Sequence, residues 1–277
     1  MSAAGGGPAG SAISSELLLV IGIIGGLIGI YLTPLNHLFG PLFASLGAVC
    51  AIVWGSDAIR RVASYGLGTG VPSIGYMSLS IGIIGTLAGI ALASSSLLRG
   101  LSVVGPVLAL VLSMVLGLVV AILAKKVVGM KIPILERCTA EIAGAAALSV
   151  LGFSAAFAGS YDFAQILTLV IGPGYIALFF ILNTLAIQHP FNACLGPNEN
   201  QVRTLKLAGA CGFLAMVIIG IITIGNPALT WKGIPASLLI NIVGLGGWII
   251  FFKKYVSASF KEAASVKWTG LWPKIEE

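Results

Sequence analysis

Charged side chains are scarce in this sequence: Asp, Glu, Lys and Arg together make up only 9% of its 277 residues. A soluble domain carries about 25% of such residues, and the mean hydropathy of +1.07 also excludes a globule that faces water on all sides. Apolar residues instead fill runs of about 17–25, the length that an α-helix needs to cross a bilayer. The sequence therefore predicts an all-α polytopic membrane protein, because a transmembrane barrel would show short alternating segments.

Histidine and cysteine are also rare, with two and four residues. The cysteines are scattered, and no pair of them has the spacing of metal ligands. We therefore expect no metal site, except that binding of a sodium ion remains an open alternative. We also expect no catalytic residues, because Walker, Rossmann and HExxH motifs are absent. The net charge of +6 is a topology signal and does not indicate nucleic-acid binding.

About eight transmembrane helices account for the hydrophobic runs, with seven as the alternative. Eight helices place thirteen Lys and Arg residues on the side of both termini and leave only Arg99 and Lys232 on the other side. By the positive-inside rule, both termini lie in the cytoplasm and the chain is a multi-pass protein of the cell membrane. The predicted spans are about 17–33, 38–54, 74–94, 102–124, 139–158, 164–187, 205–225 and 235–252.

The chain repeats a helical hairpin. The decamer IGIIGGLIGI at 21–30 recurs as IGIIGTLAGI at 81–90, and Gly-Pro recurs near the start of the second, fourth and sixth spans, with Pro235 in the same place in the eighth. Internal duplication is common in transport folds. The predicted organisation is a flexible tail (1–15), a transmembrane bundle (16–252) of hairpins 16–72, 73–133, 134–204 and 205–252, and an interfacial tail (253–277) with a short surface helix.

Small residues at four-residue spacing predict close helix packing. In membranes, GxxxG pairs let two helix backbones approach, so that dispersion replaces the missing hydrophobic driving force. We interpret these positions as packing faces that say nothing about a substrate. They are Gly22, Gly25, Gly26, Gly29, Gly85 and Gly89.

Ionisable residues inside the bilayer are costly and suggest function by default. Glu141 lies about one turn inside the fifth span, and it can either pair with Arg137, four residues before it, or join Thr139 in binding a hard cation. Asp57 lies four residues before Arg61, which predicts an ion pair between them. The residues alone leave the two interpretations of Glu141 open.

Other polar candidates are asparagines and one irregular loop. Asn183 and Asn241 lie inside spans, where they serve as hydrogen-bond partners of neighbouring helices or as ion ligands. The loop QHPFNACLGPNENQVRT (188–204) departs from the repeat, and its prolines and glycine exclude a continuous helix. It could be a solvated connector or the mouth of a cavity; Asn192, Asn198 and Glu199 are its candidate ion- or substrate-path residues.

Two segments, KIPILERCTAEIAGAAALSVLGFSAA (131–156) and the 188–204 loop, resemble the C-type membrane subunit of tetrahydromethanopterin S-methyltransferase. The resemblance implies a membrane complex of methanogenic archaea, in which a corrinoid-bearing subunit passes a methyl group from methyl-tetrahydromethanopterin to coenzyme M and sodium is pumped. It implies D- and E-type membrane subunits as partners, and a share for this chain in the sodium path and in a cytoplasm-facing cavity for coenzyme M. The corrinoid would lie on a partner subunit, and this chain alone would not be catalytic.

Two other functions fit the same composition. A self-contained secondary transporter would carry a substrate by itself in liposomes. A purely structural membrane subunit would bind neither ion nor substrate.

Overall fold

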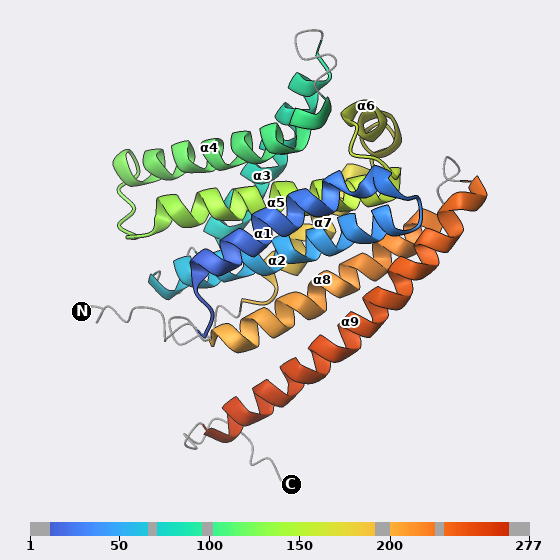
Figure 1. The fold of residues 1–277 in the computed structure, drawn as a ribbon. Helices are drawn as coiled ribbons and strands as arrows, with labels where there is room; N and C mark the ends of the chain where they lie inside the picture. The colour runs from blue at the N-terminus through green and yellow to red at the C-terminus, as the bar shows by residue number, and fades with distance from the viewer. Residues whose placement is uncertain (1–11, 66–70, 96–101, 192–199, 225–229, 266–277) are drawn as a thin grey trace.

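The computed structural model describes residues 12–65, 71–95, 102–191, 200–224 and 230–265, and within these ranges it contains helices and no strand (Figure 1). Within these described ranges, seven helices are long and apolar enough to cross a membrane, or eight if a bent pair counts as one span. The predicted fold class is thereby confirmed. The elements are α1 (Ser15–Tyr31), η1 (Thr33–Leu35), α2 (Phe39–Tyr65), α3 (Val71–Ala93), η2 (Ser102–Val104), α4 (Gly105–Lys126), α5 (Leu135–Ala158), α6 (Phe163–Ile166), η3 (Leu167–Ile171), α7 (Tyr175–Gln188), α8 (Gln201–Ile224) and α9 (Thr230–Ser265).

Helix α5 is the centre of the bundle. Nearly all of its residues are buried, and it packs against α1, α2, α3, α4, α7 and α8. Its many alanines, with Gly144 and Gly152, make this possible, because small side chains let six neighbours approach one helix. By contrast, α4 and α9 expose most of their apolar side chains, as expected for helices at the lipid-facing rim.

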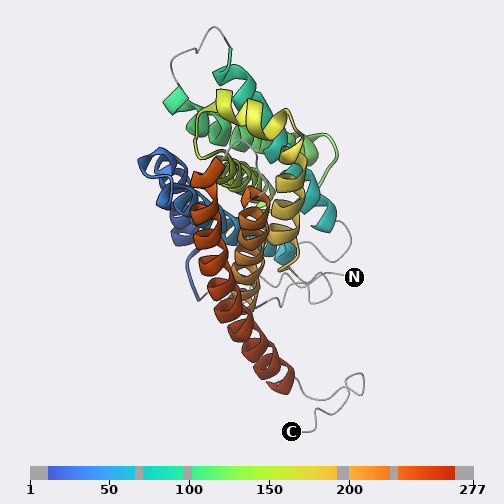
Figure 2. The ribbon, with the colours of Figure 1, turned by 90° about the vertical axis from the view of Figure 1, so that its right-hand side faces the viewer.

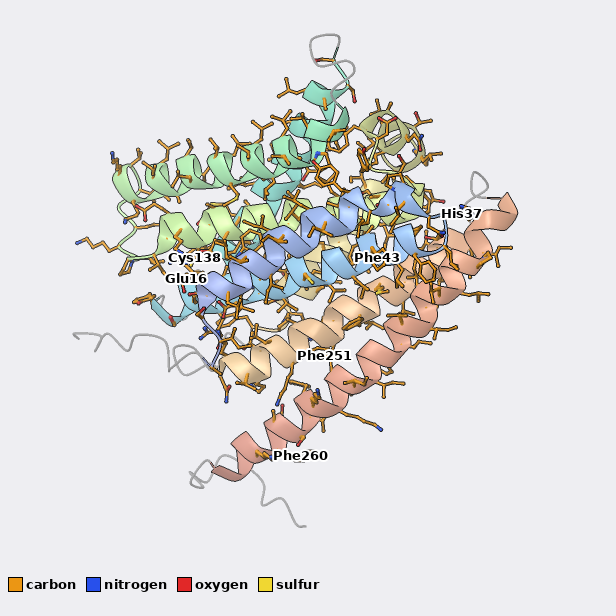
Figure 3. All side chains as sticks on the ribbon, in the orientation of Figure 1. Glu16, His37, Phe43, Cys138, Phe251 and Phe260 are labelled. Atoms are coloured by element: carbon orange, nitrogen blue, oxygen red, sulfur yellow. The ribbon has the colours of Figure 1, made fainter. Side chains whose placement is uncertain are left out.

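The helices run between two opposite ends of the bundle. Glu16, at the start of α1, lies at one end together with Cys138, near the start of α5, whereas His37 lies at the other end (Figure 3). The hydroxyl of Tyr31, at the end of α1, donates to the carbonyl oxygen of Val103, before α4, which places both at the His37 end. The hairpins α1–α2, α3–α4 and α8–α9 pack as antiparallel pairs, as the repeat predicts.

The sixth span differs from the prediction of one helix over 164–187. The chain forms a short helix, α6, continues as one π-helical turn, η3, and then bends by 90° before α7. Pro173 cannot donate a backbone hydrogen bond and Gly174 has φ +86°, so the helix cannot pass through them. Only α7 therefore runs back along the bundle, and Gly172-Pro173 lies in the bend before it, whereas Gly105-Pro106 starts α4 itself.

The C-terminal region also differs from the prediction. Residues 253–265 do not form a separate surface helix, because α9 is one helix of 36 residues in which Pro235 lies inside rather than in the first turn. Apolar residues continue on both sides of Lys253 and Lys254, which explains why the helix does not stop at this basic pair. Figure 2 shows α9 extending beyond the other helices at its C-terminal end.

Candidate functional site

A network of ion pairs lies at the Glu16 end of the bundle, where its inner members are buried and its outermost pair, Arg137 with Glu16, is exposed. It consists of three carboxylates and three guanidinium groups that alternate, and it joins α1, α2 and α5. We call it the ion-pair network. In order of contact its members are Arg60, Asp57, Arg61, Glu141, Arg137 and Glu16.

Asp57 forms the first half of the network. Its carboxylate is fully buried and accepts hydrogen bonds from Arg60 Nη2 at 2.9 Å and from Arg61 Nε at 2.9 Å. Helical periodicity brings these side chains together, because residues three and four apart share one face. Gln201, the first residue of α8, donates from Nε2 to the same carboxylate at 3.0 Å.

Glu141 forms the second half. Its carboxylate accepts from Arg137 Nε at 2.7 Å, from Trp54 Nε1 at 3.1 Å, and from Arg61 Nη2. Arg61 thus lies between Asp57 and Glu141 and is ion-paired with both. Two guanidinium groups and one indole surround the Glu141 oxygens, an arrangement that favours the ion-pair role over direct binding of a cation.

The chain before α1 closes over this end of the bundle. The backbone N–H of Ile13 donates to Gln201 Oε1 at 3.0 Å, and Gln201 Nε2 donates to the carbonyl oxygen of Ile13 at 2.9 Å. Glu16 accepts from Arg137 at 3.0 Å. Ile13, within the predicted tail of residues 1–15, is therefore held against the start of α8.

Within the described part of the chain, no hydrogen bond joins the polar candidates of the spans to the network. Asn183 is fully buried on α7, where its Oδ1 accepts from Ser149 Oγ on α5. Thr139 is also buried, and its hydroxyl has no partner among the residues that the structure describes. Asn241, on α9, lies against Gly220 on α8, with no described partner for its Oδ1. These three residues therefore do not form one site.

Three predicted site residues, Asn192, Asn198 and Glu199, lie outside the described residues. Near the network, α7 ends before these residues and α8 begins after them. Ser56, next to Asp57, donates to the carbonyl oxygen of Ile187 on α7 at 3.1 Å, and Gln201 on α8 binds Asp57 itself.

The six predicted packing glycines lie at helix crossings. Gly22, Gly25 and Gly29 of α1 face α2, and Gly26 faces Leu148 of α5. Gly85 and Gly89 of α3 face Ser113 and Ala109 of α4.

Sequence reasoning missed Glu16, Arg60, Trp54 and Gln201. The only role predicted for Arg60 is that of one of the basic residues that set the topology. Glu16 is predicted only as the first residue after the tail. The sequence does contain a signal for Arg60: it follows Asp57 by three residues, so it lies on the same helix face and can pair with it. No local pattern points to Trp54 or Gln201, since their partners are 87 and 144 residues away.

Comparison with known proteins identifies the family. The family model described as the C subunit of tetrahydromethanopterin S-methyltransferase matches residues 1–276. A protein of that name from Methanothermobacter thermautotrophicus is 64% identical over 277 residues, covering 100% of both chains. Relatives of the same name from Methanosarcina mazei and Methanocaldococcus jannaschii are 47% and 38% identical and cover 100% of this chain, and 99% and 100% of their own lengths. The chain therefore belongs to the family of the C subunit of tetrahydromethanopterin S-methyltransferase.

Proposed function

We propose that this chain is a membrane subunit that couples methyl transfer to sodium transport. In the complex, a corrinoid-bearing subunit takes the methyl group from methyl-tetrahydromethanopterin and passes it to coenzyme M, and sodium leaves the cell. This chain, with D- and E-type membrane subunits, forms the sodium path and a cytoplasm-facing cavity for coenzyme M. It is not catalytic by itself, and the corrinoid lies on a partner subunit.

The ion-pair network is the observation that carries this proposal. Six charged groups meet at one end of an otherwise apolar bundle, and such groups in membrane proteins are retained mainly where function needs them. Lys125 pairs with Glu136 at the same end, where α4 terminates and α5 begins. A basic membrane end faces the cytoplasm, which supports cytoplasmic termini and a cavity open to soluble partners.

Reconstitution of the purified complex tests the function. Vesicles that contain the whole complex are expected to take up sodium during methyl transfer to coenzyme M, and native mass measurement is expected to find this chain together with the corrinoid-bearing subunit. Methyl transfer that ignores sodium would contradict the coupling. Isolation of this chain without partners, with substrate uptake in liposomes, would favour a self-contained transporter.

Glu141→Gln is expected to lower sodium-dependent methyl transfer while the complex still assembles. The substitution keeps the shape of the side chain but removes one of the two negative charges that balance Arg61. The rate of methyl transfer is measured against sodium concentration, with Glu136→Gln as the control, because Glu136 pairs with Lys125 outside the network. An unchanged sodium response would restrict Glu141 to a structural ion pair.

Alanine at both Asn198 and Glu199 is expected to disturb methylation of coenzyme M more than assembly. The motive is the sequence of their loop, whose prolines and glycine predict a polar, non-helical segment at a membrane surface, as suits the mouth of a cavity. Coenzyme M kinetics are measured side by side with the set of subunits that remain in the purified complex. Normal kinetics in an intact complex would remove the loop from the proposed cavity.

A further inference from the structure

The end of α7 carries two buried oxygen atoms without partners. Thr184 and Gln188 are 9% and 8% exposed, and within the described chain no hydrogen bond reaches Thr184 Oγ1 or Gln188 Oε1. The two residues are four apart, so they lie on one face of the helix. A buried polar atom without a partner is costly, so two of them on one helix face need an explanation.

One of these atoms, Gln188 Oε1, faces α3. Gln188 Oε1 lies against Gly75, where an added Cβ would collide with it. Since α7 ends where α3 begins and the two helices run in opposite directions, helical geometry is expected to bring Ser78, one turn after Gly75, to the level of Thr184, one turn before Gln188. Ser78 is fully buried, and its hydroxyl donates to Ile74 O at 2.7 Å, which leaves its oxygen able to accept or to ligate. We call this contact the α3–α7 seam.

The chemistry of the seam suits a metal cation and not a proton. An amide oxygen and two hydroxyl oxygens are hard ligands of the type that binds hard cations, and none of them titrates near neutral pH. Gln188 is also the last residue of α7, and a helix C-terminus carries a partial negative charge that favours a cation.

Helix α7 is short. At about 1.5 Å per residue, its 14 residues span about 21 Å, less than the thickness of a bilayer core. A bend of 90° at Gly172–Gly174 precedes it, so the seam lies at the end of α7 that is away from this bend. Between the bend and Thr184, Phe179 of α7 packs against Phe157 of α5, with ring centroids 5.6 Å apart. This aromatic contact fills the half of α7 that is nearer the bend.

We propose that the α3–α7 seam binds a monovalent hard cation, with Gln188 Oε1 and Thr184 Oγ1 as ligands and Ser78 beside them. The ion is sodium if the proposed function holds, on which this inference rests. Gly75 leaves the space that the amide oxygen needs. The seam lies at the same end of the bundle as the ion-pair network, since Ser56 binds the carbonyl oxygen of Ile187, next to Gln188. The ion would therefore enter from that end.

The test uses the whole complex with Thr184→Val and Gln188→Leu, singly and together. Each change keeps the approximate volume and removes the oxygen. We expect the sodium concentration for half-maximal methyl transfer to rise about tenfold, as for the loss of a group that supports a metal. Sodium should also raise the melting temperature of the variant complex less than that of the parent, a readout that does not depend on turnover.

Matched controls separate ligation from packing. Thr168→Val and Gln165→Leu make the same changes at exposed residues before the bend and should leave both readouts unchanged. Thr184→Ser keeps an oxygen and should respond to sodium like the parent. If Thr184→Ser shifts the sodium response as much as Thr184→Val, the effect is packing and the inference fails.

The outcomes distinguish this inference from the function on which it rests. If the parent complex responds to sodium and the seam variants match their controls, the seam is not a sodium site, while the proposed function stands. If the parent complex itself does not respond to sodium, the proposed function fails and the inference fails with it.

Discussion

Arg61→Met is expected to prevent stable assembly of the complex. Arg61 is 7% exposed and is ion-paired with both Asp57 and Glu141. Its removal leaves two buried carboxylates with one guanidinium each. Breaking a buried ion pair from one side costs about 3–5 kcal/mol, which is a large part of the total stability of a domain. The expected observation is a strong loss of this chain from membranes, or a melting temperature far below that of the parent complex.

Lys125→Met is the matched control for this prediction. Lys125 also pairs with a glutamate, at 2.7 Å from Glu136, but both side chains are about one-third exposed, at 32% and 29%. Exposed pairs contribute only about 0–1 kcal/mol, so this variant should assemble normally. Arg61→Lys should fall between the two, since a lysine keeps the charge but cannot bind two carboxylates with a planar fork.

A combined variant makes the argument sharper. If the damage comes from carboxylates left without a partner, Arg61→Met together with Glu141→Gln should be less harmful than Arg61→Met alone, because the second change removes one of the stranded charges. Equal damage in the single and combined variants would indicate that Arg61 acts through packing. Assembly of Arg61→Met at the level of Lys125→Met would show that the network does not hold the bundle together.

The network also shows which part of the site the sequence could predict. Asp57 with Arg61, and Arg137 with Glu141, are pairs four residues apart, and helical periodicity alone predicts them. The contact between Arg61 and Glu141 joins residues 80 apart, and Glu16 reaches Arg137 across 121 residues. Such contacts depend on which helices become neighbours. No local pattern contains that information, which is why the alternating order of charges emerges only in the folded bundle.

Hydropathy predicts the spans but not all of their ends. The second span is expected to stop at Trp54, yet α2 continues to Tyr65, because Asp57, Arg60 and Arg61 satisfy one another and are buried against other helices. A scale that scores each charge as if it faced lipid must end the helix too early. The bend after η3 has the opposite origin, because one proline and one left-handed glycine break a segment that is apolar enough to be predicted as one span.

Gly29→Val is expected to separate α1 from α2. A Cβ at Gly29 would lie 3.0 Å from the Cα of Gly47, and closer still to the carbonyl oxygen of Phe43. These are backbone atoms, so no side-chain rotation can relieve the clash. Overpacking against movable side chains already costs about 1–3 kcal/mol. A larger cost is expected here, because the two helices must move apart along a crossing whose stability depends on close backbone contact.

Gly246→Val supplies the comparison that makes this prediction specific. Gly246 lies in α9 and has no atom within 4 Å of an added Cβ, so the same substitution, in another membrane helix, meets open space. Membrane abundance and the melting temperature of the assembled complex should fall strongly for Gly29→Val and change little for Gly246→Val. Gly25→Ala should lie between them, because its Cβ would meet only the side chain of Cys50, at 3.1 Å. If all three variants assemble alike, the repeated decamer is not a packing face, and its duplication must be explained by something that it binds.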